Sequence, residues 1–369
     1  MPTLAKLVVT DLRNIIETDI RPASGFNIFY GGNGSGKTSL LEAIFLLALG
    51  RSFRGHQQKP LIREGEKQAT VFGETQDGLM LGIQRSLRGP QLIRIDGKKA
   101  ESLAELTRCL PLLLINTDTF LVLEGAPRER RRFLDWGVFH VEHSFLTCWR
   151  QARLALLNRN NLLKNDASKA ELEPWTRALS KNAEMIDQFR AEHAELLRME
   201  MKSKVQELLG TQFAEKFALE YIRGWDKDLY QQIQSDLPKD RKYGHTTSGP
   251  QKADLRFKVG AYNAAEVLSR GQLKLFVCAL KIAQGKLLQK ATQKSCIFLI
   301  DDLPAELDKS NITKVCRMFG ELEGQVFLSC IDQQSLDRDI QNISLDQGQE
   351  YRLFHVKHGI IKAQFSGSV

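Results

Sequence analysis

The chain has 369 residues, more than one compact core usually holds, so we expect two domains or lobes. Hydrophobic residues make up 42% and charged residues 26%, which excludes a disordered chain, a collagen and a small disulfide scaffold. The formal charge of +8 permits binding to nucleic acid or an anionic surface, and it suits an ordinary basic enzyme equally well.

The first part of the chain predicts a strand, a glycine loop and a helix. Residues 4–9 are strand-like, and residues 26–29 form an apolar run that glycines stop, as at the end of a buried strand. Apolar residues at 41, 44, 45 and 48 then share one face of a helix. Residues 70–95 predict short strands with intervening turns.

The middle of the chain changes to long, polar, helical stretches between residues 135 and 210. Residues 164–168 predict a turn between two antiparallel helices, and Gly210 predicts a helix end. Beyond this arm we expect strands near 217, 296–300 and 326–328, and helices near 229–233, 273–280 and 312–319.

The sequence lacks the patterns of a membrane span, a signal peptide and a cysteine metal site, and these absences predict the compartment. No apolar run approaches the roughly 18 to 20 residues that span a bilayer, and the first residues lack the pattern of a signal peptide. The six cysteines stand far apart without metal-binding spacing, as expected for buried thiols in a reducing compartment. We therefore expect a cytoplasmic protein with no membrane partner.

Residues 31–38 match the phosphate-loop pattern G-x-x-x-x-G-K-[ST], after a predicted strand and before a predicted helix. Glycines let backbone N–H groups point at phosphate oxygens, and the helix N-terminus adds its positive end. Lys37 is predicted to reach the β- and γ-phosphates of ATP and to act in catalysis, and Thr38 to ligate Mg²⁺. The binding candidates are Gly31, Gly32, Asn33, Gly34, Ser35, Gly36, Lys37 and Thr38.

Two further motifs complete the predicted site. Asp301 and Asp302 follow the apolar strand 297–300, where the first acid would hold Mg²⁺ and the second would act as the general base that polarises water. Residues 268–272 open a predicted helix that Ser269 can cap, with helix-end N–H groups available to a phosphate. This pentapeptide resembles the L-S-x-G-Q signature of ABC-type ATPases, which implies contact of Ser269, Arg270, Gly271 and Gln272 with the γ-phosphate bound by a second subunit.

Taken together, the chain resembles the RecF family of bacterial recombination mediators, related to the structural-maintenance-of-chromosomes (SMC) and Rad50 ATPases. The resemblance covers nearly the whole chain and is carried by residues 11–14, 51–54, 125–136, 249–254, 268–274 and 301–308; residues 139–142 suggest the gammaproteobacterial branch. It implies an α/β fold, an ABC-type P-loop ATPase head with an inserted helical arm. The predicted parts are residues 1–135 (head), 136–212 (arm) and 213–369 (head).

The resemblance also implies partners and further site residues. Arg13 and Asn14 would lie near the nucleotide, and Asp308 would belong to a loop that crosses the dimer. ATP would dimerise two heads on DNA at single-strand/double-strand junctions or gaps, with weak DNA-stimulated hydrolysis. RecR and RecO would be partners in loading recombinase, in support of replication restart and the SOS response.

Three departures from the ABC pattern leave the γ-phosphate sensing residues open. Pro304-Ala305 stands where a serine is frequent, Ser329-Cys330 where a histidine is frequent, and residues 116–118 replace a glutamine-bearing loop. DNA contacts are also open, because two clusters of arginines have two interpretations. They would either bind the DNA backbone or be structural, as solvated or ion-paired side chains. The clusters are Arg128, Arg130, Arg131 and Arg132, and Arg51 and Arg54 beside Phe53.

Two other functions compete with DNA repair. A transporter-type ABC ATPase coupled to a membrane permease would have a compact head, and the long insert between Lys37 and Ser269 argues against it. That insert is also too short for the coiled coils of chromosome-maintenance proteins. A small-molecule P-loop kinase would leave residues 268–272 unexplained.

Overall fold

The computed structural model describes residues 3–55, 61–302, 307–331, 343, 346 and 348–364. The chain divides into two compact units, one made of Met1–Thr119 with Val277–Val369 and the other of Phe120–Phe276. Helix α11 (Arg270–Thr292) begins in the second unit and ends in the first.

The first unit contains an antiparallel sheet in the order β2-β1-β4-β5-β6-β7. In β4 every second residue is buried, as expected for a sheet with one face on the core. Its strands are β1 (Leu4–Leu12), β2 (Ile15–Ile20), β4 (Gln68–Thr75), β5 (Met80–Ser86), β6 (Leu92–Ile95) and β7 (Lys98–Lys99).

A second sheet of this unit has the order β15-β14-β3-β13-β12-β8 and is parallel except for its edge strand β15. Its strands β3, β12 and β13 are buried throughout, which explains why their sequences are mostly apolar. The carboxyl ends of β3, β13 and β12 therefore meet at one edge of the sheet. The strands are β3 (Phe26–Tyr30), β8 (Leu112–Ile115), β12 (Ile297–Ile300), β13 (Gln325–Cys330), β14 (Tyr351–Lys357) and β15 (Ile360–Gln364).

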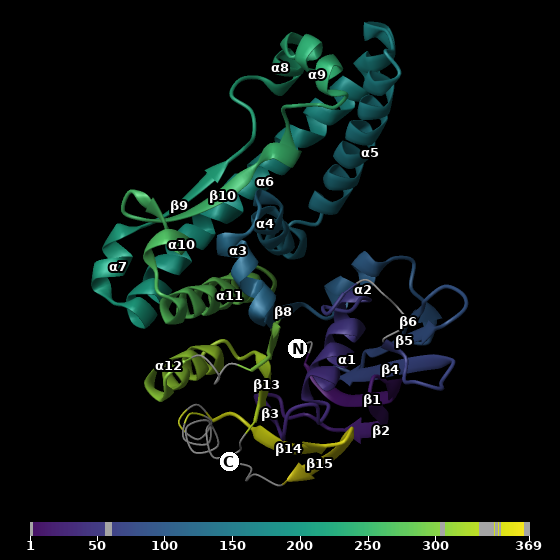
Figure 1. The fold of residues 1–369 in the computed structure, drawn as a ribbon, viewed down its shortest axis with the longest axis vertical. Helices are drawn as coiled ribbons and strands as arrows, with labels where there is room; N and C mark the ends of the chain where they lie inside the picture. Colours follow the sequence, from purple (N-terminus) through teal and green to yellow (C-terminus); the bar gives the residue numbers. More distant parts are fainter. Residues whose placement is uncertain are drawn as a thin grey trace. The chain divides into compact units, whose positions relative to one another are not determined.

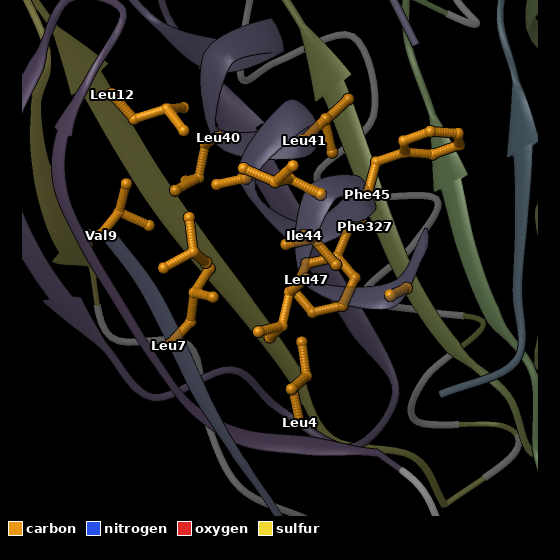
Figure 2. Packing of buried hydrophobic residues seen from close by; sticks show 14 of the residues in the cluster. Leu4, Leu7, Val9, Leu12, Leu40, Leu41, Ile44, Phe45, Leu47 and Phe327 are labelled. Atoms are coloured by element: carbon orange, nitrogen blue, oxygen red, sulfur yellow. The ribbon is translucent and has the colours of Figure 1, made fainter. Parts of the chain in front are cut away.

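Helix α1 (Lys37–Leu49) lies between the two sheets and is buried on every side from Ser39 to Ala48. Figure 2 shows its leucines among side chains of β1 and beside Phe327 of β13. The sequence predicted this helix from apolar residues that share one face, and the structure buries its other faces as well. The helix contacts β1, β4 and β5 of one sheet and β8 and β13 of the other, so all of its faces are covered. Helices α2 (Leu103–Cys109) and α12 (Lys309–Gly320) also belong to this unit.

The second unit is dominated by two long helices that lie side by side (Figure 1). Helix α5 (Phe145–Lys164) and helix α6 (Lys169–Leu209) are joined by the predicted turn, and α6 ends at Gly210 as predicted. Ser168 and Glu171 form a capping box that fixes the start of α6. Residues 136–212, the predicted arm, lie within this unit, which extends beyond them at both ends.

The remaining elements of the second unit surround these helices. A short antiparallel sheet has the order β11-β10-β9. The elements are 3-10 helix η2 (Thr117–Phe120), which starts in the first unit, α3 (Leu121–Glu124), α4 (Pro127–Val141), α7 (Thr211–Lys216), β9 (Phe217–Ile222), α8 (Leu229–Ser235), α9 (Leu237–Tyr243), 3-10 helix η3 (Pro250–Lys252), β10 (Asp254–Val259), β11 (Tyr262–Asn263) and α10 (Ala264–Val267).

Candidate active site

The phosphate-loop residues connect β3 directly to α1, the context that their pattern requires. The Lys37 ammonium donates to the carbonyl oxygens of Gly31 at 2.6 Å and Gly32 at 2.9 Å, so the lysine folds back over its own loop. Burial lowers the pKa of Lys37, and nearby acidic groups oppose that shift. A bound phosphate would add a further anionic partner to this partly desolvated ammonium.

The two acids predicted after β12 lie beside this loop. The Thr38 hydroxyl donates to Oδ1 of Asp301 at 3.2 Å, across 263 positions of sequence. Oxygen ligands of this kind suit Mg²⁺, and the convergence of a hydroxyl with a carboxylate at the phosphate loop fits the predicted metal site.

Ser329, at the end of β13, links the two acids to each other. Its hydroxyl donates to Oδ1 of Asp301 at 2.7 Å and accepts the backbone N–H of Asp302 at 2.9 Å. Asp302 has a φ of 57°, a left-handed conformation that costs energy for a residue with a Cβ atom. The hydrogen bond to the Ser329 hydroxyl therefore stabilises the exposed Asp302 in this left-handed conformation.

A cleft of about 890 Å³ contains these groups within the first unit. The loop that stands in place of the glutamine-bearing loop contributes Asn116, Thr117 and Asp118 to its wall. Apart from Asp308, the motifs predicted for this unit all contribute residues to the wall of the cleft. The described residues that form it include Arg13, Asn14, Asn33, Gly34, Ser35, Gly36, Lys37, Thr38, Arg54, Asn116, Thr117, Asp118, Asp301, Asp302 and Ser329. Its size, and the lysine, hydroxyl and carboxylate groups that line it, suit a nucleoside triphosphate.

Arg13 and Asn14 lie in the cleft, as the family resemblance implied, but their present partners are protein groups. Arg13 makes two hydrogen bonds of 2.8 Å to the carboxylate of Glu42, which is fully buried in α1 and also hydrogen-bonded to Ser52. This pairing explains how an acid can occupy a helix that is buried on all sides. Asn14 braces the phosphate loop, because its side chain donates to the Gly34 carbonyl at 3.3 Å and accepts the Ser39 hydroxyl at 2.9 Å.

The signature residues belong to the second unit, where Ser269 caps α11 as predicted. Its hydroxyl accepts the N–H of Gln272 at 3.4 Å, and the Gln272 side chain accepts the N–H of Ser269 at 2.9 Å. Ser269 and Arg270 are exposed, and Gly271 and Gln272 are half-buried. Arg270 lies 3.5 Å from the carboxylate of Glu124, an exposed ion pair. The signature therefore presents a capped helix start to its surroundings.

Asp308 begins α12, where its carboxylate accepts the N–H of Asn311 at 2.9 Å. The side chain is exposed and is not among the described residues that line the cleft. Pro304 and Ala305, one of the three departures, lie outside the described residues.

The arginines of α4 that predicted DNA contacts are mostly occupied by structural partners. Arg130 makes a two-pronged ion pair with Asp254 at 2.7 and 3.1 Å, and Arg131 donates to the carbonyl of Ala253 at 2.7 Å. Arg132 pairs with Glu129 on the same helix, whereas Arg128 is exposed. Three of the four arginines therefore have protein partners, and those of Arg130 and Arg131 could not be predicted from the sequence because Asp254 and Ala253 lie far along the chain.

The second basic cluster divides between the core and the surface. The Phe53 ring packs edge-on against Phe45 of α1, with ring centroids 5.3 Å apart, so it serves the core. Arg54 lines the nucleotide cleft, and Arg51 is exposed.

In the described part of the chain, no helix is both long and apolar enough to cross a membrane.

Comparisons with known proteins agree with this arrangement. Residues 3–352 match the family model described as the RecF/RecN/SMC N terminal domain. The chain is 46% identical over 366 residues to the DNA replication and repair protein RecF of Stutzerimonas stutzeri (strain A1501), covering 97% of each chain. The protein of the same name from Pseudomonas aeruginosa (strain LESB58) is 44% identical over 364 residues, covering 97% of this chain and 96% of the relative.

A solved structure shares the fold. The recombination mediator protein RecF with ATP, described as part of the RecFOR pathway, has a TM-score of 0.83 and 24% sequence identity to this chain. The likeness covers 98% of this chain and 99% of the solved one. The predicted fold class, an ABC-type ATPase head related to SMC proteins, is confirmed.

Proposed function

Because the chain belongs to the RecF family of DNA replication and repair proteins, we propose that it binds DNA in an ATP-dependent manner and hydrolyses ATP to ADP and phosphate. The transporter alternative has no support among the comparisons, which match RecF proteins over almost the full chain. The kinase alternative leaves the capped signature helix without a role.

One observation carries the ATPase proposal: Thr38, Asp301, Ser329 and Asp302 form a continuous hydrogen-bonded chain at the carboxyl edge of the parallel sheet. It joins the phosphate loop to the acids after β12 through a residue of the strand between them. A glycine-rich turn without a role in binding would not be expected to contact the acids at the end of a neighbouring strand.

We propose a separate task for each group. The backbone N–H groups of the phosphate loop bind phosphate oxygens, and Lys37 moves from its carbonyl partners to the β- and γ-phosphates. Thr38 and Asp301 would hold Mg²⁺, which neutralises charge that develops on the phosphates. Asp302 accepts a proton from the water that attacks the γ-phosphorus.

The partners of the protein follow from the family and the charge. We propose that ATP brings two copies together through Ser269 of one and the nucleotide of the other, around DNA held by its backbone. The excess of 52 basic over 44 acidic residues supports such sequence-independent binding. RecR and RecO are the proposed protein partners, acting at DNA gaps and junctions in the cytoplasm. The proposal follows from the solved RecF structure, which is described as that of a mediator in the RecFOR pathway.

The ATPase proposal is tested by measuring hydrolysis of MgATP by the purified protein with and without duplex DNA. We expect weak turnover that duplex DNA stimulates, and none in Lys37→Ala, because this variant lacks the cation on the β/γ-phosphates. Lys98→Ala removes an exposed lysine of the same unit and should hydrolyse ATP as the wild type does. Normal turnover by Lys37→Ala would refute the phosphate-loop assignment.

DNA binding is tested by its dependence on salt. Affinity for duplex DNA should fall with salt concentration by a log–log slope of about 0.9 for each phosphate contact, and vary little with sequence. A flat salt response, or a strong preference for one sequence, would contradict recognition through the DNA backbone.

A further inference from the structure

The turn between β14 and β15 reaches the phosphate loop from the opposite end of the chain. It consists of two residues, His358 and Gly359, with φ angles of 49° and 78°. Two left-handed residues are typical of the tight hairpin turn whose twist matches its strands. The N–H of Gly359 donates to the carbonyl oxygen of Ser35 at 2.7 Å, which joins this hairpin to the middle of the phosphate loop.

The contact allows no side chain at position 359. A Cβ atom built on Gly359 would lie 2.0 Å from the carbonyl oxygen of Asn14 and 2.9 Å from its carbonyl carbon. One loop residue is equally close to β14, because a Cβ atom on Gly31 would lie 2.2 Å from the Val356 carbonyl oxygen. Two turns thus hold the phosphate loop: Asn14 contacts it through its side chain, and Gly359 contacts it through its backbone.

The hydrogen bond from Gly359 has a consequence for phosphate binding. In a trans peptide the C=O of one residue and the N–H of the next point in opposite directions. Fixing the Ser35 carbonyl on Gly359 therefore turns the N–H of Gly36 to the other side. Loops of this class bind phosphate oxygens through such N–H groups, so the hairpin fixes the orientation of a binding group that it does not itself supply.

We propose that Gly359 is a positioning residue of the nucleotide site, through which the C-terminal hairpin sets the affinity of the phosphate loop for ATP. The inference rests on the proposed function, because it requires ATP to bind the loop. It adds to that function a dependence on a segment more than three hundred residues away from the motif.

The test compares Gly359→Ala with Gly78→Ala in the full chain. Gly78 lies in the β4–β5 turn with a φ of 84°, close to the 78° of Gly359, but a Cβ atom there meets nothing within 4 Å. Both variants carry similar backbone strain, and only one disturbs the loop. Because the loop binds phosphate in ground and transition states alike, Gly359→Ala should raise KM for MgATP about tenfold or more with kcat changed less than about threefold. Gly78→Ala should match the wild type.

A second pair of variants avoids the steric clash. One glycine inserted between Lys357 and His358 would move the Gly359 N–H away from Ser35 without adding a side chain, and one inserted between Asp77 and Gly78 is its control. The first insertion should raise KM in the same way, and the second should not, with circular dichroism confirming that both chains are folded.

The outcomes separate the two proposals. A wild-type protein that binds no ATP, measured by titration with a fluorescent ATP analogue, would overturn the proposed function and the inference with it. Wild-type binding together with an unchanged KM in the folded Gly359→Ala or Lys357–His358 insertion variant would overturn the inference alone. A fall in kcat with unchanged KM would also overturn it, because the hairpin would then act on a step other than binding.

Discussion

At the residue scale, Ser329 is the group that connects the phosphate-loop side of the sheet to both acids. Its hydroxyl contacts the Asp301 carboxylate at 2.7 Å and the Asp302 N–H at 2.9 Å. Ser329→Ala should slow hydrolysis roughly 10- to 100-fold, since a hydrogen bond to a charged group contributes about 1.5–3 kcal/mol. The control Ser180→Ala removes a buried hydroxyl for which the described residues provide no partner, and its turnover should be unchanged. Equal rates in the two variants would argue against the bridging role.

Substitutions of the adjacent acids Asp301 and Asp302 should have different effects, because only Asp301 accepts a hydrogen bond from Thr38. Asp301→Asn should weaken Mg²⁺-dependent nucleotide binding. Asp302→Asn should keep ATP and Mg²⁺ and slow the chemical step by roughly 10²–10⁴, the contribution typical of a general base. Single-turnover hydrolysis and the lifetime of the ATP-bound dimer on DNA measure the two effects. If turnover and lifetime both match the wild type, Asp302 is not the base.

Residue types were predictable where a local pattern defines them, and their partners were not. The phosphate loop and both acids follow from short contiguous motifs, and the structure places them in one cleft. The sequence marked Ser329 only as a departure from the frequent histidine, because its partners lie 27 and 28 positions earlier. The pairing of Arg13 with Glu42 gave no signal either, since it depends on how β1 lies against α1.

At the element scale, the ion pair between buried Arg190 and half-buried Asp135 joins α6 to α4. Two hydrogen bonds of 2.7 and 2.9 Å join them, and Arg190 also donates to the Pro250 carbonyl at 2.8 Å. Arg190→Met should lower the free energy of unfolding by about 3–5 kcal/mol, because it leaves a carboxylate without its partner. Arg198→Met, on an exposed pair of the same helix, should cost less than about 1 kcal/mol. Denaturant unfolding measures the free energy of unfolding of both variants. Similar losses in the two would contradict a structural role for the Arg190–Asp135 pair.

Elements with strong boundaries were predicted better than their surroundings. The turn at 164–168 and the end of α6 at Gly210 follow from residues that favour turns and helix ends. The burial of α1 on all sides was not predictable, because its periodic pattern shows one apolar face and says nothing of a second sheet. For the arginines of α4, the basic run could not indicate which side chains have acidic partners on β10.

At the scale of the whole molecule, the motifs predicted the fold class, while the strand order came only from the structure. The strand–loop–helix unit and the acidic strand indicate a parallel sheet. Nothing local indicates that β14, near the C-terminus, lies directly beside β3 and delivers Gly359 to the phosphate loop. Pairings between strands this far apart are fixed by global packing, which periodicity within a window does not report.

The proposed ATP-driven dimerisation provides the last prediction, because we propose that it depends on Ser269, whose hydroxyl caps α11 in its own subunit. Ser269 is exposed and caps α11 through Gln272. Ser269→Arg should leave ATP binding by the monomer nearly intact and eliminate ATP-driven dimerisation and hydrolysis, since the bulky side chain would occupy the place of the second subunit's γ-phosphate.

Ser168→Arg is the matched control, because Ser168 is also an exposed serine in a capping box, at the start of α6. Loss of either cap should cost about 1 kcal/mol of stability, so the two variants differ only in what their serines face in a dimer. Sedimentation with and without ATP and DNA distinguishes them: Ser168→Arg should dimerise and Ser269→Arg should remain monomeric. If Ser269→Arg instead loses affinity for ATP as a monomer, the signature acts on the nucleotide of its own subunit, and a dimer that shares its nucleotides is excluded.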